Sequence, residues 1–161
     1  MSSNKKNHYL VIKFFIIFFS LIFPLKALEI KIVDGDTIHI NKDKIRFSGI
    51  DAPELNQTCL LNNNVVNCGK ISKELLIKKI ANNIPNCIKE GIDQYNRILA
   101  ECFVNNKSLS SYLVRNGYAF AYRKYSKKFI EDEEYAQKNN LGMWAMKFDF
   151  PWDFRKKKLV F

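Results

Sequence analysis

The chain has 161 residues, of which 47% are hydrophobic and 26% are charged. This length is enough for one ordinary domain with a hydrophobic core, and we find neither an internal repeat nor room for a second domain. Lys and Arg number 26 against 16 Asp and Glu, which gives a net charge of +10. A basic surface favours polyanionic partners, but lysine is frequent throughout the chain, so charge alone is weak support.

The first 27 residues have the pattern of a targeting segment. Three lysines precede the apolar run 14–23, and Pro24-Leu25-Lys26-Ala27 follows it. A membrane-spanning helix needs roughly 20 apolar residues, about twice the length of this run. We therefore predict a signal peptide, 1–27, that is cleaved after Ala27, and a protein exported to the periplasm or the medium. An uncleaved N-terminal membrane anchor is the alternative.

Residues 28–161 are predicted to form a single domain with a basic C-terminal tail. Residues 1–27 contain four lysines and no acidic residue, so the remaining chain keeps a net charge of +6. The tail 151–158 places Pro, Trp and Phe before the basic run Arg155-Lys156-Lys157-Lys158. We interpret it as aromatic anchors followed by a basic run.

All four cysteines lie in this part of the chain: Cys59, Cys68, Cys87 and Cys102. An even number of cysteines in an exported protein predicts disulfides, and three pairings are possible. Cys87 and Cys102 stand equally far from the centre of an expected hairpin at 94–95, so we favour a bond between them, which leaves Cys59 with Cys68. A zinc site is the alternative, but the chain has no Cys-x-x-Cys, and only His39 follows residue 27.

Five short runs have the composition of β-strands: 29–33, 37–40, 44–48, 86–90 and 98–104. Asp34-Gly35 between the first two is a strong hairpin signal, and the third run completes a three-stranded meander. The last two runs are expected to pair as a hairpin around the turn 93–97. Residues 55–67 are polar, rich in Asn and without periodicity, so we expect a surface loop closed by the first disulfide.

Three segments are predicted to form helices. Apolar residues recur at helical spacing over 69–81. A second helix is expected to start at Ser108 or Ser110 and to stop at Gly117, and a third to cover 128–139. Five strands with about three helices fit the α+β class, as a five-stranded Greek-key barrel of the OB type with helices packed at one end.

Two acidic turns carry the candidate metal ligands. Asp36 follows the first hairpin turn and Asp51 follows the third strand, so neighbouring strands would bring both carboxylates to one edge of the barrel. Oxygen ligands of this kind select Ca²⁺ or Mg²⁺. A backbone carbonyl from Ala52 and water molecules would complete an open site that a substrate phosphate can join. Taken alone, each Asp is also ordinary turn chemistry.

Glu54, Arg46 and Arg97 would supply the remaining groups for phosphodiester hydrolysis. Glu54 follows a rigidifying proline and can act on a water as a general base. The planar forks of the two arginines can grip a phosphate and neutralise the charge that develops during attack. Surface ion pairing is the alternative for both. Two tyrosines are candidates for stacking on a base or bonding a phosphate along the groove, unless they serve packing: Tyr95 and Tyr125.

Four motifs together resemble the thermonuclease family, also called staphylococcal-nuclease-like. They are Asp-Gly-Asp-Thr at 34–37, Arg-Phe-Ser-Gly-Ile-Asp-Ala-Pro-Glu at 46–54, Asp-Gln-Tyr-Asn-Arg at 93–97 and Gly-Met-Trp at 142–144. The similarity covers 29–155, and the ending Pro-Trp-Asp-Phe-Arg resembles exported members. Asn96 stands where the family usually has Gly, and Asn tolerates a left-handed turn conformation.

The resemblance implies an OB-fold nuclease that depends on Ca²⁺, cuts DNA and RNA with little sequence preference and leaves 3′-phosphate ends. By matching positions, the calcium ligands would be Asp36, Asp51 and the carbonyl of Ala52, and the catalytic residues would be Arg46, Glu54 and Arg97. Glu54 would activate the water, Arg46 would hold the phosphate and Arg97 would neutralise charge near the leaving oxygen. The same donors would also accept Mg²⁺.

Two other functions stay open at this point. A catalytically silent OB module that binds nucleic acid needs only a basic groove and stacking aromatics, but binding does not require Glu54 beside the phosphate. A membrane-tethered protein that meets acidic lipid rests only on the uncleaved segment and the charge. The preferred interpretation is an exported, monomeric, calcium-dependent endonuclease for DNA and RNA, without stable membrane association after cleavage.

Overall fold

The structure of the chain is a computed structural model that describes residues 28–158. The predicted signal peptide, 1–27, lies outside the described residues. Within 28–158, short strands alternate with four α-helices and one 3₁₀-helix, which confirms the predicted α+β class. No helix in this part of the chain is long and apolar enough to cross a membrane.

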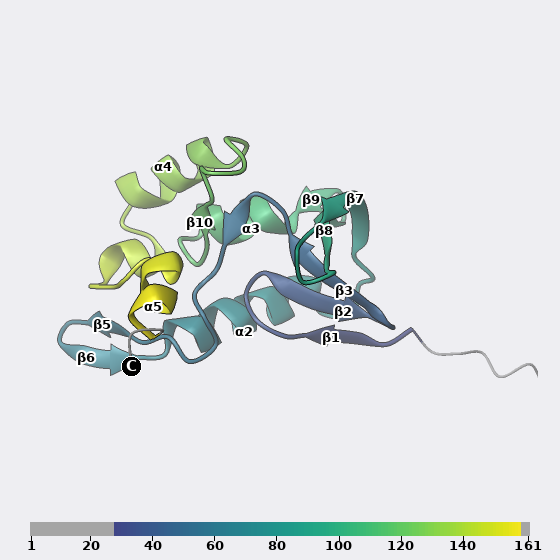
Figure 1. The fold of residues 1–161 in the computed structure, drawn as a ribbon. Coiled ribbons are helices and arrows are strands. Elements are labelled where there is room, and N and C mark those ends of the chain that lie inside the picture. The colour runs from purple at the N-terminus through teal and green to yellow at the C-terminus, as the bar shows by residue number, and fades with distance from the viewer. Residues whose placement is uncertain (1–27, 159–161) are drawn as a thin grey trace, which may run out of the picture.

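A curled sheet, five of whose six strands form one continuous path, lies at one end of the molecule (Figure 1). In spatial order the strands are β1 (Ile30–Ile32), β2 (Thr37–Ile40), β3 (Asp43–Phe47), β8 (Ile98–Val104) and β7 (Asn86–Ile92), and β9 (Lys107–Ser108) also pairs with β8. The first three strands form the predicted antiparallel meander, and β7 with β8 forms the predicted hairpin. β3 and β8 run parallel. This half-barrel confirms the expected OB-type fold.

The remaining elements lie beside and beyond the sheet. They are β4 (Ile50–Asp51), β5 (Cys59–Leu61), β6 (Asn64–Val66), α2 (Cys68–Ile80), α3 (Leu109–Arg115), β10 (Phe120–Ala121), α4 (Ile130–Lys138), the 3₁₀-helix η2 (Gly142–Ala145) and α5 (Pro151–Lys158). In Figure 1, α4, α5 and the β5–β6 hairpin occupy the end opposite the sheet, and α2 and α3 lie between the two ends.

Three of the helices lie close to where the sequence predicts them. Asn67 caps α2, because its side chain accepts the backbone N–H of Lys70 at 2.7 Å. Ser108 caps α3, as one of the two predicted starts, and Gly117 follows that helix with a φ of +73°. α4 is shorter than the predicted 128–139. Asn96 adopts the left-handed conformation expected of it, with a φ of 60°.

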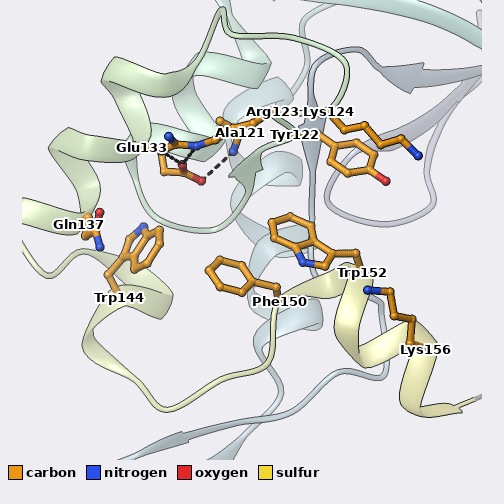
Figure 2. A pocket seen from close by; sticks show the side chains of 10 residues that line it. All are labelled: Ala121, Tyr122, Arg123, Lys124, Glu133, Gln137, Trp144, Phe150, Trp152 and Lys156. Carbon is orange, nitrogen blue, oxygen red and sulfur yellow. Dashed lines mark hydrogen bonds and ion pairs between the residues drawn. The ribbon is translucent and has the colours of Figure 1, made fainter.

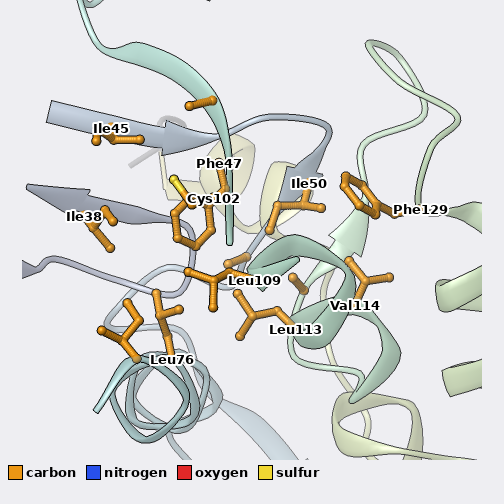
Figure 3. Packing of buried hydrophobic residues seen from close by; sticks show 14 of the residues in the cluster. Ile38, Ile45, Phe47, Ile50, Leu76, Cys102, Leu109, Leu113, Val114 and Phe129 are labelled. Atoms are coloured by element: carbon orange, nitrogen blue, oxygen red, sulfur yellow. The ribbon is translucent and has the colours of Figure 1, made fainter. Parts of the chain in front are cut away.

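The main hydrophobic core lies between the sheet and the helices α2 and α3. Figure 3 shows Ile38 and Phe47 from the sheet facing Leu76 of α2 and Leu113 of α3. All four side chains are almost completely buried. Complete burial of such a side chain contributes about 1.5–3 kcal/mol, so this contact fixes the sheet relative to both helices.

The prediction of a surface loop over 55–67 is wrong for its second half. Cys59–Leu61 and Asn64–Val66 form the antiparallel hairpin β5–β6. The two residues between them, Asn62 and Asn63, have positive φ values of 51° and 64°, which suits a two-residue hairpin turn. Asn rather than Gly occupies this turn, so the hairpin signal in the sequence is weaker than that of Asp34-Gly35.

The tail 151–158 forms the helix α5, which the sequence analysis does not predict. Pro151 is its first residue, where a missing backbone N–H costs nothing. α5 lacks an apolar stripe at helical spacing, and aromatic packing holds it instead. The ring of Phe120 contacts four other aromatic rings, those of Trp144, Phe148, Phe150 and Trp152, and we call these five residues the Phe120 cluster. The centroids of the four rings lie 5.0 to 6.2 Å from that of Phe120.

The two disulfides are those preferred from the sequence. Cys87 and Cys102 are register partners in β7 and β8, so their bond crosses the hairpin as expected. Cys59 bonds to Cys68 and ties the start of β5 to the start of α2. The described part of the chain contains no free cysteine.

Loss of the bond between Cys87 and Cys102 should lower the stability of the protein. This bond joins residues separated by 15 positions, and closing a loop of that size stabilises by about 3 kcal/mol in the chain-entropy model. We expect the double substitution Cys87→Ala/Cys102→Ala to lower the free energy of unfolding by about that amount in a urea titration. Four reactive thiols in denatured, unreduced wild-type protein would contradict both bonds.

Candidate active site

The turn between β1 and β2 places Asp36 against the residue that follows β4. Asp34 accepts the backbone N–H of Asp36 at 3.0 Å and holds the turn in shape. A Cβ on Gly35 would collide with Ser72 Oγ and lie 2.8 Å from the Cβ of Ala52, so this approach requires glycine. As a result, Asp36 Oδ2 accepts the backbone N–H of Ala52 at 2.7 Å.

Arg46 joins Asp36 and Asp51 in one charged cluster. Arg46 is the register partner of Thr37 in the antiparallel pair β2–β3, which brings its side chain next to Asp36. Its guanidinium donates one hydrogen bond to Asp36 Oδ1 and another to Asp51 Oδ1, the latter at 2.7 Å. Asp36 is 2% exposed and Asp51 is 0% exposed. Carboxylates buried to this degree require such a partner.

Arg155 of α5 completes the cluster from the other side. Its Nη2 donates to Asp51 Oδ2 at 2.6 Å, and its Nη1 donates to Asp51 Oδ1 at 3.2 Å and to Glu54 Oε1 at 2.8 Å. Both oxygens of Asp51 therefore accept hydrogen bonds from arginine. No role for Arg155 is predicted from the sequence, because only the helix α5 brings this residue to a partner 104 positions earlier in the chain.

Burial and neighbouring charges perturb the ionisation of the cluster. The pKa of Asp36 is raised from 3.8 to about 7, chiefly by burial and also by the negative charges of Asp34 and Asp51, while the charge of Arg46 opposes the shift. Burial disfavours the charged form of Arg155, but its bonds to Asp51 and Glu54 outweigh that cost and raise its pKa. The cluster is thus crowded with negative charge that cations must balance.

Glu54 is positioned by Gln57 and by the first turn of α2. Gln57 is completely buried; its Oε1 accepts the N–H of Glu54 at 3.2 Å, and its Nε2 donates to the carbonyl of Asp149 at 2.7 Å. A Cβ on Gly69 would collide with the carbonyl oxygen of Glu54, so α2 packs directly on this turn. Gln57 lies within the segment expected to be a loop, and sequence reasoning missed it for that reason.

Arg97 and Tyr95 lie on the β7–β8 turn. Asp93 accepts the N–H groups of Tyr95 and Arg97 at 2.9 Å each, and it accepts Arg97 Nε at 2.8 Å. Slight burial opposes ionisation of Asp93, but these hydrogen bonds prevail and lower its pKa. In the described residues, Arg97 bonds to Asp93 rather than to the cluster of Asp36 and Asp51.

Tyr125 is 69% exposed, and Tyr122 rather than Tyr125 lines the pocket shown in Figure 2. The pocket has a volume of about 610 Å³, within the range of ligand-binding sites. Its walls combine aromatic side chains, basic side chains and a buried acid: Tyr122, Trp144, Phe150, Trp152, Arg123, Lys124, Lys156 and Glu133. Glu133 pairs with Arg123 at 2.7 Å. The pocket therefore keeps a positive balance.

Several aromatic rings in the pocket lie parallel to each other. The rings of Phe150 and Trp152 are 4.7 Å apart and inclined by 6°, and those of Tyr122 and Trp152 are 5.8 Å apart and inclined by 7°. Figure 2 shows these rings beside the basic side chains of Lys124 and Lys156. Aromatic side chains next to cations are the groups on which unpaired bases stack, but the faces that these rings turn to each other are already covered.

The cluster offers a cation two carboxylates rather than a complete cage. In residues 28–158, no three His, Cys, Asp or Glu side chains are arranged to hold a metal ion. Asp36 and Asp51 both contact Arg46, and the backbone of Ala52 lies against Asp36. The carboxylates of Asp36 and Asp51 are hard oxygen donors, so they fit a Ca²⁺ or Mg²⁺ ion whose remaining ligands are water or substrate.

One family model and several known proteins are similar to this chain. The family model described as staphylococcal nuclease homologue matches residues 44–146. A probable staphylococcal-like nuclease, CAN2, of Oryza sativa subsp. japonica is 31% identical over 124 residues, which cover 75% of this chain and 31% of that protein. An uncharacterized endonuclease of Haemophilus influenzae is 32% identical over 123 residues, which cover 72% of this chain and 64% of that protein.

A third relative carries a different name. The succinoglycan biosynthesis protein ExoI of Rhizobium meliloti is 29% identical over 120 residues, which cover 72% of this chain and 63% of that protein. The chain thus spans between about a third and just under two thirds of the length of these three relatives. The family model covers more than half of the chain and includes Arg46, Asp51, Glu54 and Arg97, so the protein belongs to the staphylococcal nuclease homologue family.

Proposed function

We propose that the protein is an exported, Ca²⁺-dependent endonuclease that hydrolyses phosphodiester bonds of DNA and RNA and leaves 3′-phosphate ends. One observation carries the proposal: Asp36, Arg46, Asp51 and Glu54 converge on one charged cluster, in which the two aspartates are buried. Membership of the staphylococcal nuclease homologue family supports nuclease activity. Two disulfides support an oxidising compartment and hence export.

Asp36, Asp51 and the carbonyl of Ala52 would hold the metal ion. When bound, Ca²⁺ would supply a Lewis acid that polarises the phosphoryl group. The chain's own part is to keep both carboxylates in place before the ion arrives. Asp36 is fixed by Arg46 and by the N–H of Ala52, and Asp51 is fixed by Arg46 and Arg155.

Glu54 is the candidate general base. Its side chain is 37% exposed, whereas that of Asp51 is 0% exposed, so water reaches Glu54 but not Asp51. Gln57 and α2 hold its backbone, which limits the positions that the carboxylate can take. A positioned carboxylate of this kind takes the proton from the attacking water.

Arg46 and Arg97 would bind the phosphate from two neighbouring strands. Arg46 and Leu99 are register partners in the parallel pair β3–β8, and Arg97 precedes β8 by one residue. Asp93 holds Arg97 in one orientation, so the planar fork is ordered before substrate binds. Two ordered guanidinium groups would neutralise the charge that develops on the phosphoryl oxygens.

The substrate strand would extend from the cluster to the aromatic pocket. α5 contributes Arg155 to the cluster and Trp152 and Lys156 to the pocket, so the two sites adjoin. Tyr95 on the β7–β8 turn is 70% exposed, and its ring centroid lies 5.5 Å from Cζ of Arg97. It can therefore contact the substrate strand on the side of the cluster away from the pocket. Tyr125 borders the pocket through its contact with Tyr122.

Replacement of Glu54 should separate catalysis from binding. We expect Glu54→Gln to lower the rate of nucleotide release from DNA and RNA by at least about a hundredfold, with little change in affinity for nucleic acid. The measurement is acid-soluble nucleotide release with Ca²⁺, with Mg²⁺ and with chelator. Glu134→Gln, an exposed position on α4, is the matched control. If Glu54→Gln loses rate and affinity equally, the role of Glu54 is structural. If wild type binds nucleic acid but does not cleave it, the silent OB module is favoured.

Binding of Ca²⁺ should weaken as the pH falls below 7. The pKa of Asp36 is raised to about 7, so below that pH the carboxyl must release a proton before it can bind the ion. Release of one proton per ion lowers the apparent affinity by up to about tenfold per pH unit. Calorimetric titrations between pH 5.5 and 7.5 test this, and a Ca²⁺ affinity independent of pH would contradict it.

Low pH, which weakens Ca²⁺ binding, should stabilise the fold of the metal-free protein through the same raised pKa of Asp36. Between pH 3.8 and about 7 the folded state holds a proton on Asp36 that the unfolded chain has released. This contribution to the free energy of unfolding is complete below pH 3.8 and is lost as the pH rises through 7. With chelator present, thermal melts should therefore show that the stability of wild type falls as the pH rises from 3.8 to about 7. Asp36→Asn should reduce this fall. An equal fall in the variant would show that groups other than Asp36 cause it.

The basic side chains of the pocket should contribute to binding of single strands. We expect Lys124→Gln/Lys156→Gln to weaken binding of single-stranded DNA and to reduce the slope of log affinity against log salt by about 1.4, because two phosphates would no longer be neutralised by lysine. Fluorescence anisotropy over a range of salt concentrations measures the slope. Lys31→Gln/Lys42→Gln is the control, because both lysines are exposed, Lys31 on the edge strand β1 and Lys42 in the β2–β3 turn. Equal slopes for all three proteins would remove the pocket from the binding surface.

A further inference from the structure

We propose that Arg155 is a built-in competitor of the metal ion: it binds Asp51 and Glu54 when no cation is present and must leave Asp51 when Ca²⁺ binds. This inference rests on the metal site of the proposed function and adds a side chain that controls access to it. The exchange would set the calcium concentration at which the cluster can bind substrate.

The contacts of Asp51 leave no room for the guanidinium of Arg155 and a calcium ion at the same time. Arg155 Nη2 lies 2.6 Å from Asp51 Oδ2, and Arg155 Nη1 and Arg46 Nη2 both bond Asp51 Oδ1. A calcium ion requires a carboxylate oxygen at about 2.3–2.6 Å. It would therefore occupy the position of the guanidinium group and repel its charge.

Arg155, and not Arg46, is the arginine that can leave. The side chain of Arg46 is 17% exposed, extends from the middle of the sheet and also bonds Asp36. The side chain of Arg155 is 38% exposed and extends from α5. Release of this side chain exposes a long charged group to water without opening the sheet.

α5 can keep its place when Arg155 moves. The helix is anchored by Trp152, which packs between Tyr122 and Phe150 with parallel rings. Lys157 adds an exposed ion pair to Asp149 at 2.7 Å. These contacts do not involve the guanidinium of Arg155, so the exchange is a local movement of one side chain.

The direct test compares Ca²⁺ affinity in three proteins by isothermal titration calorimetry. We expect Arg155→Gln to bind Ca²⁺ at least about tenfold more tightly than wild type, because the ion no longer has to displace charge-assisted hydrogen bonds. Arg115→Gln is the matched control: it also removes an Arg–Asp pair, that of Arg115 with Asp132 at 3.2 Å, but away from the cluster. Its Ca²⁺ affinity should stay within about twofold of wild type.

The outcomes separate this inference from the proposed function. If wild type and Arg155→Gln bind Ca²⁺ equally, or the variant binds more weakly, Arg155 is not a competitor, although the metal site stands. If neither protein binds Ca²⁺, the metal site itself is wrong, and this inference is wrong with it. Tighter binding in the variant alone supports the exchange.

A second measurement on the wild-type protein covers the case in which Arg155→Gln does not fold. In the metal-free protein, the bonds of Arg155 to Asp51 and Glu54 should restrict rotation of its guanidinium group. Nitrogen-15 NMR of arginine side chains should then show separate Nη signals for Arg155 that merge on addition of Ca²⁺. Nη signals of Arg155 that stay separate and keep their metal-free chemical shifts at saturating Ca²⁺ would overturn the proposal.

Discussion

The buried carboxylate of Asp51 is the constraint on which the site depends. Asp51 is 0% exposed, and a buried charge that loses its partner costs about 3–5 kcal/mol. Arg46 from β3 and Arg155 from α5 supply its partners. Through this one side chain, the sheet that opens the domain is joined to the helix that ends the described part of the chain.

Packing around Phe120 makes that junction possible. Phe120 is the register partner of Asp51 in the β10–β4 pair, and the Phe120 cluster holds the segment that leads into α5. Arg155, three residues after Trp152, thereby returns to Asp51. Under the proposed function, the helix that balances the buried charge would also cover the cation site, so stability of the metal-free protein and readiness for catalysis would oppose each other.

Much of the fold could be predicted because its signals are local. Asp34-Gly35 marks the first hairpin, and the spacing of Cys87 and Cys102 around the next one indicates their bond, which the structure contains. α5 could not be predicted, because its packing depends on aromatic residues that meet only in the folded chain. The same holds for the candidate site. The proximity of Asp36 and Arg46 could be predicted because it depends on the pairing of neighbouring strands. The contacts of Arg155 and Gln57 could not be predicted, because their partners are remote in sequence. The catalytic and metal-binding roles of the named residues stay predictions.

The most direct test of this account is a crystal structure of the protein with Ca²⁺ and a short oligonucleotide bound to the Glu54→Gln variant. We expect a calcium ion between Asp36 and Asp51, a phosphate in contact with Arg46 and Arg97, and the guanidinium of Arg155 turned away from Asp51. A calcium ion bound elsewhere, with Arg155 still on Asp51 and the phosphate remote from Arg46, would contradict it.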